Sequence, residues 1–282
     1  MAEILKGAPV AAALSEELIR RAAALRGAGI LPTLAILRVG ERPDDVAYEN
    51  AAVKRCEKVG VSVRRVLLPH SCAREALLDA VARINDDPAI HGCLLFRPLP
   101  DRESEAAACA LLSPEKDVDG CTAGSLAAVF TGKGPGFPPC TAQACLELLD
   151  YYGISPAGKR VAVVGRSLVI GRPVAMMLQS RDATVTMCHS KTADLAAACR
   201  EADIVVAAAG QAGLIDASCV RAGQVVLDVG INVTAEGTLR GDVRFDEAEP
   251  VVKAITPVPA GVGAVTTAVL AKHVLQAAER SL

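Results

Sequence analysis

Short runs of apolar residues alternate with longer stretches of helical periodicity along most of this chain. An apolar run bounded by turn residues predicts a buried strand, and a longer stretch of period 3.6 predicts a helix. The predicted strands cover residues 34–39, 62–68, 92–96, 160–164, 184–187, 203–208 and 224–229. Because helical patterns lie between most of these strands, we predict an α/β protein with buried parallel strands.

Two segments rich in glycine and proline divide this series of elements. The first, TGKGPGFPP at 131–139, is crossed by no regular element and marks a domain boundary. The second, TPVPAGVG at 256–263, precedes a final helix that starts near Thr266. We therefore predict two α/β domains with a cleft between them. They are residues 1–139, to which the helix at 266–282 returns, and residues 140–265, a Rossmann-like doubly wound parallel sheet.

The composition narrows the classes of function. Lysine and arginine number 30 against 32 acidic residues, and aromatic residues make up only 2%, so no nucleic-acid partner is indicated. The ten cysteines form no CxxC and the four histidines are dispersed, so no metal site is expected. Charges interrupt every long apolar stretch, including the N-terminal one, so we expect neither a membrane span nor a signal peptide. These features predict a cytoplasmic protein.

A glycine-containing turn follows the predicted strand at 160–164. Its turn residues are Gly165, Arg166, Ser167, Gly171 and Pro173. A helix is predicted directly after them, at 174–179. A strand, a glycine turn and a helix N-terminus form an anion site from backbone N–H groups and the helix dipole. The pattern reads GxSxxxGxP instead of GxGxxG, so an ordinary tight βα turn explains this segment as well.

The end of the next predicted strand indicates which dinucleotide fits. NAD sites usually place a carboxylate about 20 residues beyond the glycine turn, where it binds the ribose 2′-hydroxyl. Here the strand is followed by His189 and Ser190, with no acid. Arg166 together with Ser190 suits a 2′-phosphate, which predicts NADP, whereas His189 is equally well explained as a solvated loop residue. Further candidates for cofactor contacts follow two later strands, at Gly210 and Ile231.

Eight ordered segments resemble the methylenetetrahydrofolate dehydrogenase/cyclohydrolase family. They are VGERPDDVAYENAAVKRCEKVG, KDVDG, PPCT, VVGRSLVIGRP, CHSKT, DVGIN, GDV and ITPVPAGVG. The resemblance implies a homodimer whose subunits bind a tetrahydrofolate one-carbon derivative with the domain at 1–139 and NADP with the domain at 140–265. The usual family chemistry is oxidation of 5,10-methylenetetrahydrofolate with NADP, followed by hydrolysis of the methenyl product to 10-formyltetrahydrofolate.

The folate half departs from the family pattern at two catalytic positions. Tyr48 matches the family's helical Tyr, but Ala52 stands four residues later, where the family has a catalytic Lys. Phe96 stands where the family has a Gln before a Leu-Pro-Leu-Pro run. The family's pterin-binding carboxylate is retained as Asp119. By resemblance, Tyr48 and Asp119 are the catalytic and substrate-binding residues of this half.

The family's PGGVGPM loop is also altered. The resemblance makes Pro259 and Gly261 substrate contacts, while Ala260 and Ala264 replace a Gly and a Pro.

No neighbour on the helix of Tyr48 replaces the missing Lys with the same chemistry. At 3.6 residues per turn, Lys54 points about 120° away from Tyr48, as a solvated side chain would. Arg55 shares the face of Tyr48, but its guanidinium does not release a proton near neutrality. Asp45 shares that face too, and it either offers a carboxylate to the site or, with Asp44, caps the start of the helix.

The two substitutions affect the two reactions differently. Hydride transfer requires alignment of the folate methylene with the nicotinamide, whereas hydrolysis of the methenyl bridge requires proton transfer. We therefore expect NADP-dependent oxidation of 5,10-methylenetetrahydrofolate to 5,10-methenyltetrahydrofolate, with weak or absent cyclohydrolase activity. Three alternatives stay open: a fully bifunctional enzyme, a catalytically silent paralogue that binds folate or nucleotide, and a dehydrogenase of another substrate.

Overall fold

The computed structural model describes residues 1–234 and 237–282, and the chain divides into two compact units. The six-stranded unit comprises Met1–Ala11 and Thr141–Thr266. The three-stranded unit comprises Ala12–Cys140 and Thr267–Leu282. Each unit combines a parallel sheet with helices, so the predicted fold class, two α/β domains, is confirmed.

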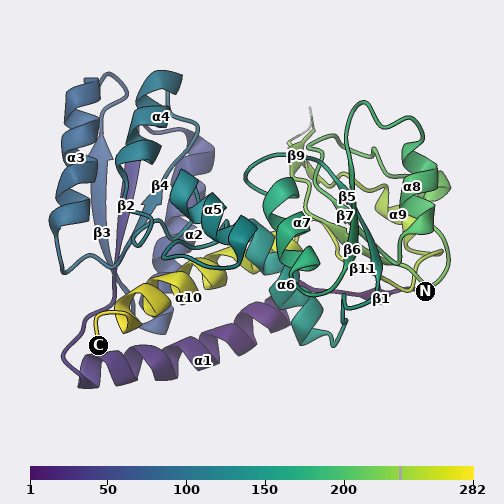
Figure 1. The fold of residues 1–282 in the computed structure, drawn as a ribbon, viewed down its shortest axis with the longest axis horizontal. Helices are drawn as coiled ribbons and strands as arrows, with labels where there is room; N and C mark the ends of the chain where they lie inside the picture. The colour runs from purple at the N-terminus through teal and green to yellow at the C-terminus, as the bar shows by residue number, and fades with distance from the viewer. Residues whose placement is uncertain (235–236) are drawn as a thin grey trace. The chain divides into compact units, whose positions relative to one another are not determined.

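The sheet of the six-stranded unit is parallel throughout and has the order β1-β11-β8-β7-β5-β6 (Figure 1). The strands are β1 Glu3–Ile4, β5 Arg160–Val164, β6 Thr184–Cys188, β7 Ile204–Ala207, β8 Val225–Asp228 and β11 Ala254–Ile255. A two-stranded antiparallel hairpin pairs β9 (Asn232–Val233) with β10 (Leu239–Arg240). Val, Ile and Ala dominate the central strands because both faces of a parallel sheet are covered.

The direction of winding changes beside β5. From β5 the chain passes to β6 at the edge of the sheet and then to β7 on the other side of β5. In doubly wound sheets such a switch point opens a crevice at the carboxyl ends of the strands, where ligands bind. The fold therefore makes the loops after β5, β6 and β7 the candidate ligand site of this unit.

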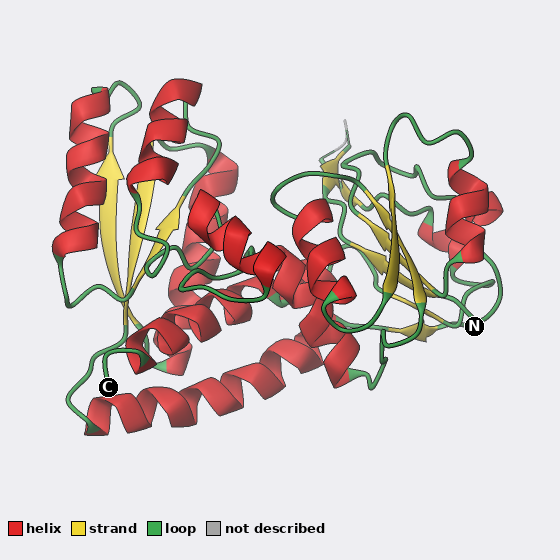
Figure 2. Cartoon of the chain, viewed as in Figure 1, coloured by secondary structure: helices red, strands yellow, loops and turns green. Residues whose placement is uncertain are grey.

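Helices flank this sheet on both faces (Figure 2). Ala162 and Val164 of β5 pack into a core with α8 (Leu195–Glu201) and α9 (Phe245–Ala248). Because side chains alternate along a strand, the intervening residues Val161 and Val163 lie on the opposite face, where they are equally buried. Helix α7 (Gly171–Gln179) packs on β5 and β6.

The sheet of the three-stranded unit has the parallel order β3-β2-β4. Its strands are β2 Thr33–Val39, β3 Ser62–Leu68 and β4 Gly92–Leu95. Ala35 and Leu37 of β2 pack into a core with α3 (Arg74–Asp86) and α4 (Arg102–Leu111), which lie side by side in Figure 1. The alternate residues of β2 face away from this core.

Local sequence explains where α2 (Pro43–Val59) begins and ends. Proline at the first helical position needs no N–H partner and has a helical φ. At the other end Gly60 adopts φ +86°, and its N–H donates to the carbonyls of the last turn. The remaining α-helices are α1 Gly7–Gly27, α5 Ala123–Thr131, α6 Cys140–Tyr151 and α10 Thr266–Glu279, and two 3₁₀ helices cover Ala217–Cys219 and Val262–Ala264.

All seven predicted strands occur in the structure, with bounds that differ by at most one residue at either end. The prediction for α7 was less accurate, because the helix begins at Gly171 and not at residue 174. The two-residue strands β1 and β11 were not predicted. They are too short to show a period and exist through pairing with each other and with β8.

Candidate functional site

The turn after β5 requires glycine at two positions. Gly165 has φ +133°, and a Cβ on it would lie well inside 3.0 Å of the carbonyl oxygen of Ala208, which follows β7. A Cβ on Gly171 would come equally close to the carbonyl oxygen of Gly165. Only glycine therefore lets the turn after β5, the start of α7 and the chain after β7 meet at the switch point.

Ser167 shapes this turn from within. Its Oγ accepts the N–H of Ile170 at 3.1 Å and the N–H of Gly171 at 3.5 Å, where α7 begins. Pro173 is buried in the first turn of α7, where its missing N–H costs no helical hydrogen bond. The hydroxyl of Ser167 thus has a structural role in the turn, while the side chain of Arg166 is exposed to solvent.

The pairing of β5 with β6 relates Arg166 to Ser190. Val164 pairs with Cys188, so each of the two candidates lies two residues beyond a paired position, at the same edge of the sheet. Both residues are exposed. The intervening His189 is half-buried, and its Nδ1 accepts the N–H of Lys191 at 3.1 Å, so its ring braces its own turn.

A buried carboxylate that sequence reasoning missed holds the loop after β7. Asp242 is fully buried and accepts three backbone N–H groups at 2.6, 2.9 and 2.9 Å, those of Ala209, Gly210 and Gln211. It also accepts the side-chain N–H of Asn232 at 2.9 Å. Asp242 therefore joins the loop after β7, which contains the predicted residue Gly210, to the chain that follows β8.

Asp228, at the end of β8, has a similar role. Its carboxylate accepts the N–H groups of Gly230, Asp242 and Val243 at 3.0, 2.9 and 3.0 Å. Burial raises the pKa of Asp228 to about 6, although these hydrogen bonds act in the opposite direction. The DVGIN and GDV segments thus form one cross-braced edge, beside which the side chain of Ile231 is 63% exposed. In the sequence, the only indication of this brace was that DVGIN and GDV are two of the eight segments that resemble the family.

The loop at 256–263 carries the altered residues. Ala260 has φ +77°, a left-handed conformation that favours glycine. Its carbonyl accepts the N–H of Gly7 at 2.9 Å. Gly261 leaves no room for a Cβ beside the carbonyl oxygen of Pro257, whereas Pro259 is exposed. Of the two predicted substrate contacts, Pro259 therefore presents a side chain and Gly261 allows the loop to fold closely.

In the three-stranded unit the structure brings Tyr48 and Phe96 together. Their ring centroids are 5.9 Å apart at an interplanar angle of 71°, an edge-to-face contact. Tyr48 is half-buried and Phe96 is 7% exposed. Ala52, on the same helix as Tyr48, is fully buried. The two positions predicted to replace the family's Lys and Gln are therefore apolar and buried.

Asp45 pairs with an arginine and does not cap the helix. The N-cap of α2 is Arg42, with no side-chain capping bond, so the expected capping by Asp44 or Asp45 is wrong. Instead, Arg42 donates from Nε and Nη2 to the two carboxylate oxygens of Asp45 at 2.8 and 2.7 Å. Asp45 therefore lies in a bidentate ion pair, with one hydrogen bond from Arg42 to each carboxylate oxygen.

The remaining charged residues of α2 point elsewhere. Arg55 donates to the hydroxyls of Ser15 at 2.8 Å and Thr267 at 3.4 Å, so its guanidinium has partners outside α2. Lys54 is exposed, as its helical position predicts.

Asp119 lies in the KDVDG segment and differs from its neighbour Asp117. Asp117 is fully buried and accepts two backbone N–H groups just before α5, at 3.0 and 2.7 Å. Asp119 is half-buried and accepts the N–H of Cys140 at 3.2 Å. Burial raises the pKa of Asp119, while the hydrogen bonds from Cys140 and the charge of Arg97 oppose that rise. Asp119 thus keeps acceptor capacity for a ligand, beside an arginine that sequence reasoning did not single out.

The six-stranded unit has the features of a dinucleotide-binding protein: a doubly wound parallel sheet and a glycine turn at its switch point. Comparison with known proteins identifies the particular family. Residues 139–282 match the model of the tetrahydrofolate dehydrogenase/cyclohydrolase NAD(P)-binding domain, and residues 5–119 match the model of the catalytic domain of the same enzymes. This chain therefore belongs to the tetrahydrofolate dehydrogenase/cyclohydrolase family.

Similar proteins match over the whole length of this chain. A bifunctional protein FolD from Carboxydothermus hydrogenoformans is 50% identical over 281 residues, covering 99% of this chain and 98% of the relative. The crystal structure of the bifunctional enzyme FolD from Campylobacter jejuni has a TM-score of 0.96 at 35% identity and covers 100% of both chains. The Trypanosoma brucei dehydrogenase-cyclohydrolase, complexed with NADP cofactor and inhibitor, has a TM-score of 0.92 at 38% identity, covering 99% of this chain and 98% of that one.

Two further properties concern the described part of the chain, residues 1–234 and 237–282. No helix there is both long and apolar enough to cross a membrane. The same residues contain no group of three or more His, Cys, Asp or Glu side chains that could hold a metal ion.

Proposed function

We propose that this protein is an NADP-dependent 5,10-methylenetetrahydrofolate dehydrogenase. The observation that carries the proposal is the register of β5 and β6, because it brings exposed Arg166 and Ser190 to one sheet edge with no carboxylate in the usual NAD position. The Trypanosoma brucei relative, whose structure contains NADP, supports the choice of cofactor.

The residues at the switch point fit this cofactor. The turn at Gly165 and Gly171 has no room for a Cβ, so its backbone can approach a pyrophosphate closely. Ser167 holds this turn, and the exposed Arg166 would bind the 2′-phosphate with Ser190. Gly210 and Ile231 would contact the remainder of the dinucleotide from the edge braced by the two aspartates. NADP, when bound, supplies the acceptor of the hydride.

The substrate proposed is a tetrahydrofolate one-carbon derivative. Asp119 would accept N–H groups of the pterin ring, and Tyr48 would orient the substrate beside Phe96. Pro259 and Gly261 would contribute from the loop at 256–263. Because hydride transfer requires alignment and no proton exchange with a side chain, the apolar residues Ala52 and Phe96 leave this step feasible.

We further propose that hydrolysis of the methenyl product is weak. That step requires a group that moves protons, and a well-placed acid–base group typically contributes about 10²–10⁴-fold in rate. Ala52 and Phe96 carry no such group, and the carboxylate of Asp45 is engaged by Arg42. The second candidate is a fully bifunctional enzyme, which is favoured because the relatives from Carboxydothermus hydrogenoformans and Campylobacter jejuni are named bifunctional.

Two broader features complete the proposal. All ten cysteines are free thiols. Free thiols are consistent with a reducing, cytoplasmic compartment. The family resemblance supports a homodimer.

An Arg166→Ala variant tests the cofactor assignment. Loss of a charge-assisted bond to the 2′-phosphate should cost about 1.5–3 kcal/mol, which raises KM for NADP by about tenfold or more and changes KM for NAD much less. The control is Lys159→Ala, which removes an exposed cation just before β5, at the opposite end of that strand. Initial rates of NADPH and NADH formation from methylenetetrahydrofolate give both constants. An equal loss with the two cofactors would contradict the assignment.

A further inference from the structure

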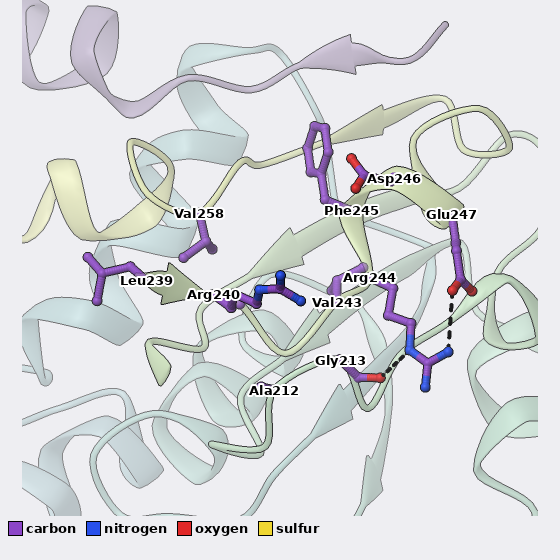
Figure 3. Close-up of a pocket in the computed structure, with 11 residues that line it drawn as sticks. Ala212, Gly213, Leu239, Arg240, Val243, Arg244, Phe245, Asp246, Glu247 and Val258 are labelled. Carbon is purple, nitrogen blue, oxygen red and sulfur yellow. Dashed lines mark hydrogen bonds and ion pairs between the residues drawn. The ribbon is translucent and has the colours of Figure 1, made fainter. Parts of the chain in front are cut away.

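A hollow of about 440 Å³ opens on the six-stranded unit (Figure 3). It is lined by Ala212 and Gly213 of the loop after β7, strand β10, Gly241, the segment 243–247 and Val258. None of these residues is among the proposed contacts of NADP or folate. The volume lies within the range of small-molecule sites, about 300–1,000 Å³.

The two arginines of the hollow differ in how they are held. Arg244 donates from Nε to the carbonyl oxygen of Gly213 at 3.1 Å and from Nη1 to Glu247 at 3.3 Å, as the dashed lines of Figure 3 show. The guanidinium of Arg240 points into the ring of lining residues and makes no hydrogen bond or ion pair within residues 1–234 and 237–282. Asp246 lies beside Phe245 in the same view, apart from Arg240.

Apolar side chains line the hollow beside Arg240. Leu239 is 44% exposed, and Phe245 and Val258 are half-buried, so each presents apolar surface in the hollow. A guanidinium with unused donors binds carboxylate and phosphate groups well, and a neighbouring apolar wall favours a ligand with an apolar body. We propose that this hollow is a binding site for a small organic anion. Its carboxylate or phosphate group is bound by Arg240, and its body packs against Leu239, Phe245 and Val258.

The position of the hollow couples it to the loop after β7. Gly241 and Val243 line the hollow, and between them lies Asp242, whose carboxylate holds the N–H groups of residues 209–211. A ligand in the hollow therefore contacts both segments that Asp242 ties together. As a second part of the proposal, a bound anion stabilises the arrangement that the proposed NADP site requires, in which case the anion and NADP would increase each other's affinity by the same factor.

Calorimetric titration of the full-length protein saturated with NADP tests the site, because NADP then occupies the phosphate-binding position at Arg166. The probes are phenyl phosphate and benzoate, and binding of either at one site per chain supports the proposal and identifies the anionic group. Inorganic phosphate and benzyl alcohol, which supply the anionic group and the apolar body separately, should bind at least about tenfold more weakly. Absence of binding by both probes would overturn the proposal.

Variants locate the site. Arg240→Gln should weaken binding of the probe at least about tenfold, since it removes a charge-assisted hydrogen bond. Arg160→Gln is the matched control, because Arg160 is an exposed arginine of the same unit at the amino end of β5, and its probe affinity should equal that of the wild type. Unchanged affinity in Arg240→Gln, or equally tight binding of benzyl alcohol, would show that the proposed anion site is wrong.

The coupling is measured separately, as the dissociation constant of NADP with and without saturating probe. The probe should tighten NADP binding in the wild type and in Arg160→Gln, and not in Arg240→Gln. Displacement of NADP by the probe would place the probe in the cofactor site and overturn the proposal. Failure of NADP to bind in the absence of probe would instead contradict the proposed function, and the titration of the protein without NADP would still test Arg240.

Discussion

At the scale of single residues, Ala260 holds a backbone conformation that its side chain disfavours. Its φ of +77° costs an L-residue about 1–2 kcal/mol of folding free energy. Glycine avoids this cost, but it also loses more conformational entropy on folding, so only part of the difference appears as added stability. We expect Ala260→Gly to stabilise the protein by about 0.5–1 kcal/mol, seen as a higher midpoint of thermal unfolding. The control Ala264→Gly replaces a residue of negative φ in a short 3₁₀ helix and should lower the midpoint. Equal shifts in the two variants would contradict the argument.

Single residues also mark the limit of what helical geometry predicts. The face shared by Tyr48, Asp45 and Arg55 followed from 3.6 residues per turn, and so did the exposure of Lys54. The partners did not follow, because Arg42 lies before the helix and Ser15 and Thr267 are distant in sequence. The hydrogen-bond partners of a long arginine side chain depend on which acceptors the folded chain brings close to it.

At the scale of elements, a buried ion pair joins α2 to β2. Arg38 donates to Glu49 at 2.6 Å, and the two side chains are only 6% and 5% exposed. Glu49→Ala leaves the buried guanidinium without this partner, which should cost about 3–5 kcal/mol of unfolding free energy. The matched control Asp150→Ala breaks the surface pair with Arg181, where the side chains are 52% and 34% exposed, and should cost at most about 1 kcal/mol. Denaturant unfolding measures both, and similar losses would refute the distinction.

The brace between the ends of β7 and β8 predicts a dependence on pH. Burial raises the pKa of Asp228 to about 6 from its ordinary 3.8, so the folded protein holds this proton more tightly than the unfolded chain. The resulting contribution to stability is fully present below about pH 4 and is lost as the pH rises to about 6. We expect the unfolding midpoint of the wild type to fall across this range relative to that of Asp228→Asn, whose side chain does not titrate. Parallel curves for the two proteins would show that Asp228 is not responsible.

The regular elements were more predictable than the contacts that brace them. Apolar runs located β2 to β8 because each is long enough to show a buried strand. The same runs carry no information about Asp228 and Asp242, whose hydrogen bonds join three loops separated by up to 33 residues. Strands β1 and β11 depend on pairing between opposite ends of the chain, 251 residues apart at Glu3 and Ala254, which no local pattern records.

At the scale of the whole molecule, the family and the fold class were readable from the sequence, and the loss of two catalytic side chains at Ala52 and Phe96 stays a prediction. The structure adds that Phe96 packs edge-to-face on Tyr48 and that Ala52 is fully buried, so neither position has a polar replacement in place. It also shows the carboxylate of Asp45 in an ion pair with Arg42. These contacts support a dehydrogenase with weak hydrolysis, whereas the relatives named bifunctional support the full pair of reactions.

The most direct measurement follows both reactions in one sample of purified wild-type protein. Methylenetetrahydrofolate and NADP are mixed in a buffer where methenyltetrahydrofolate hydrolyses slowly, and NADPH and the methenyl compound are recorded together. We predict that the two products form in equal amounts and that the methenyl compound then decays no faster than without protein. Hydrolysis of added methenyltetrahydrofolate well above the uncatalysed rate, abolished by Tyr48→Phe, would instead establish a working cyclohydrolase and contradict the account.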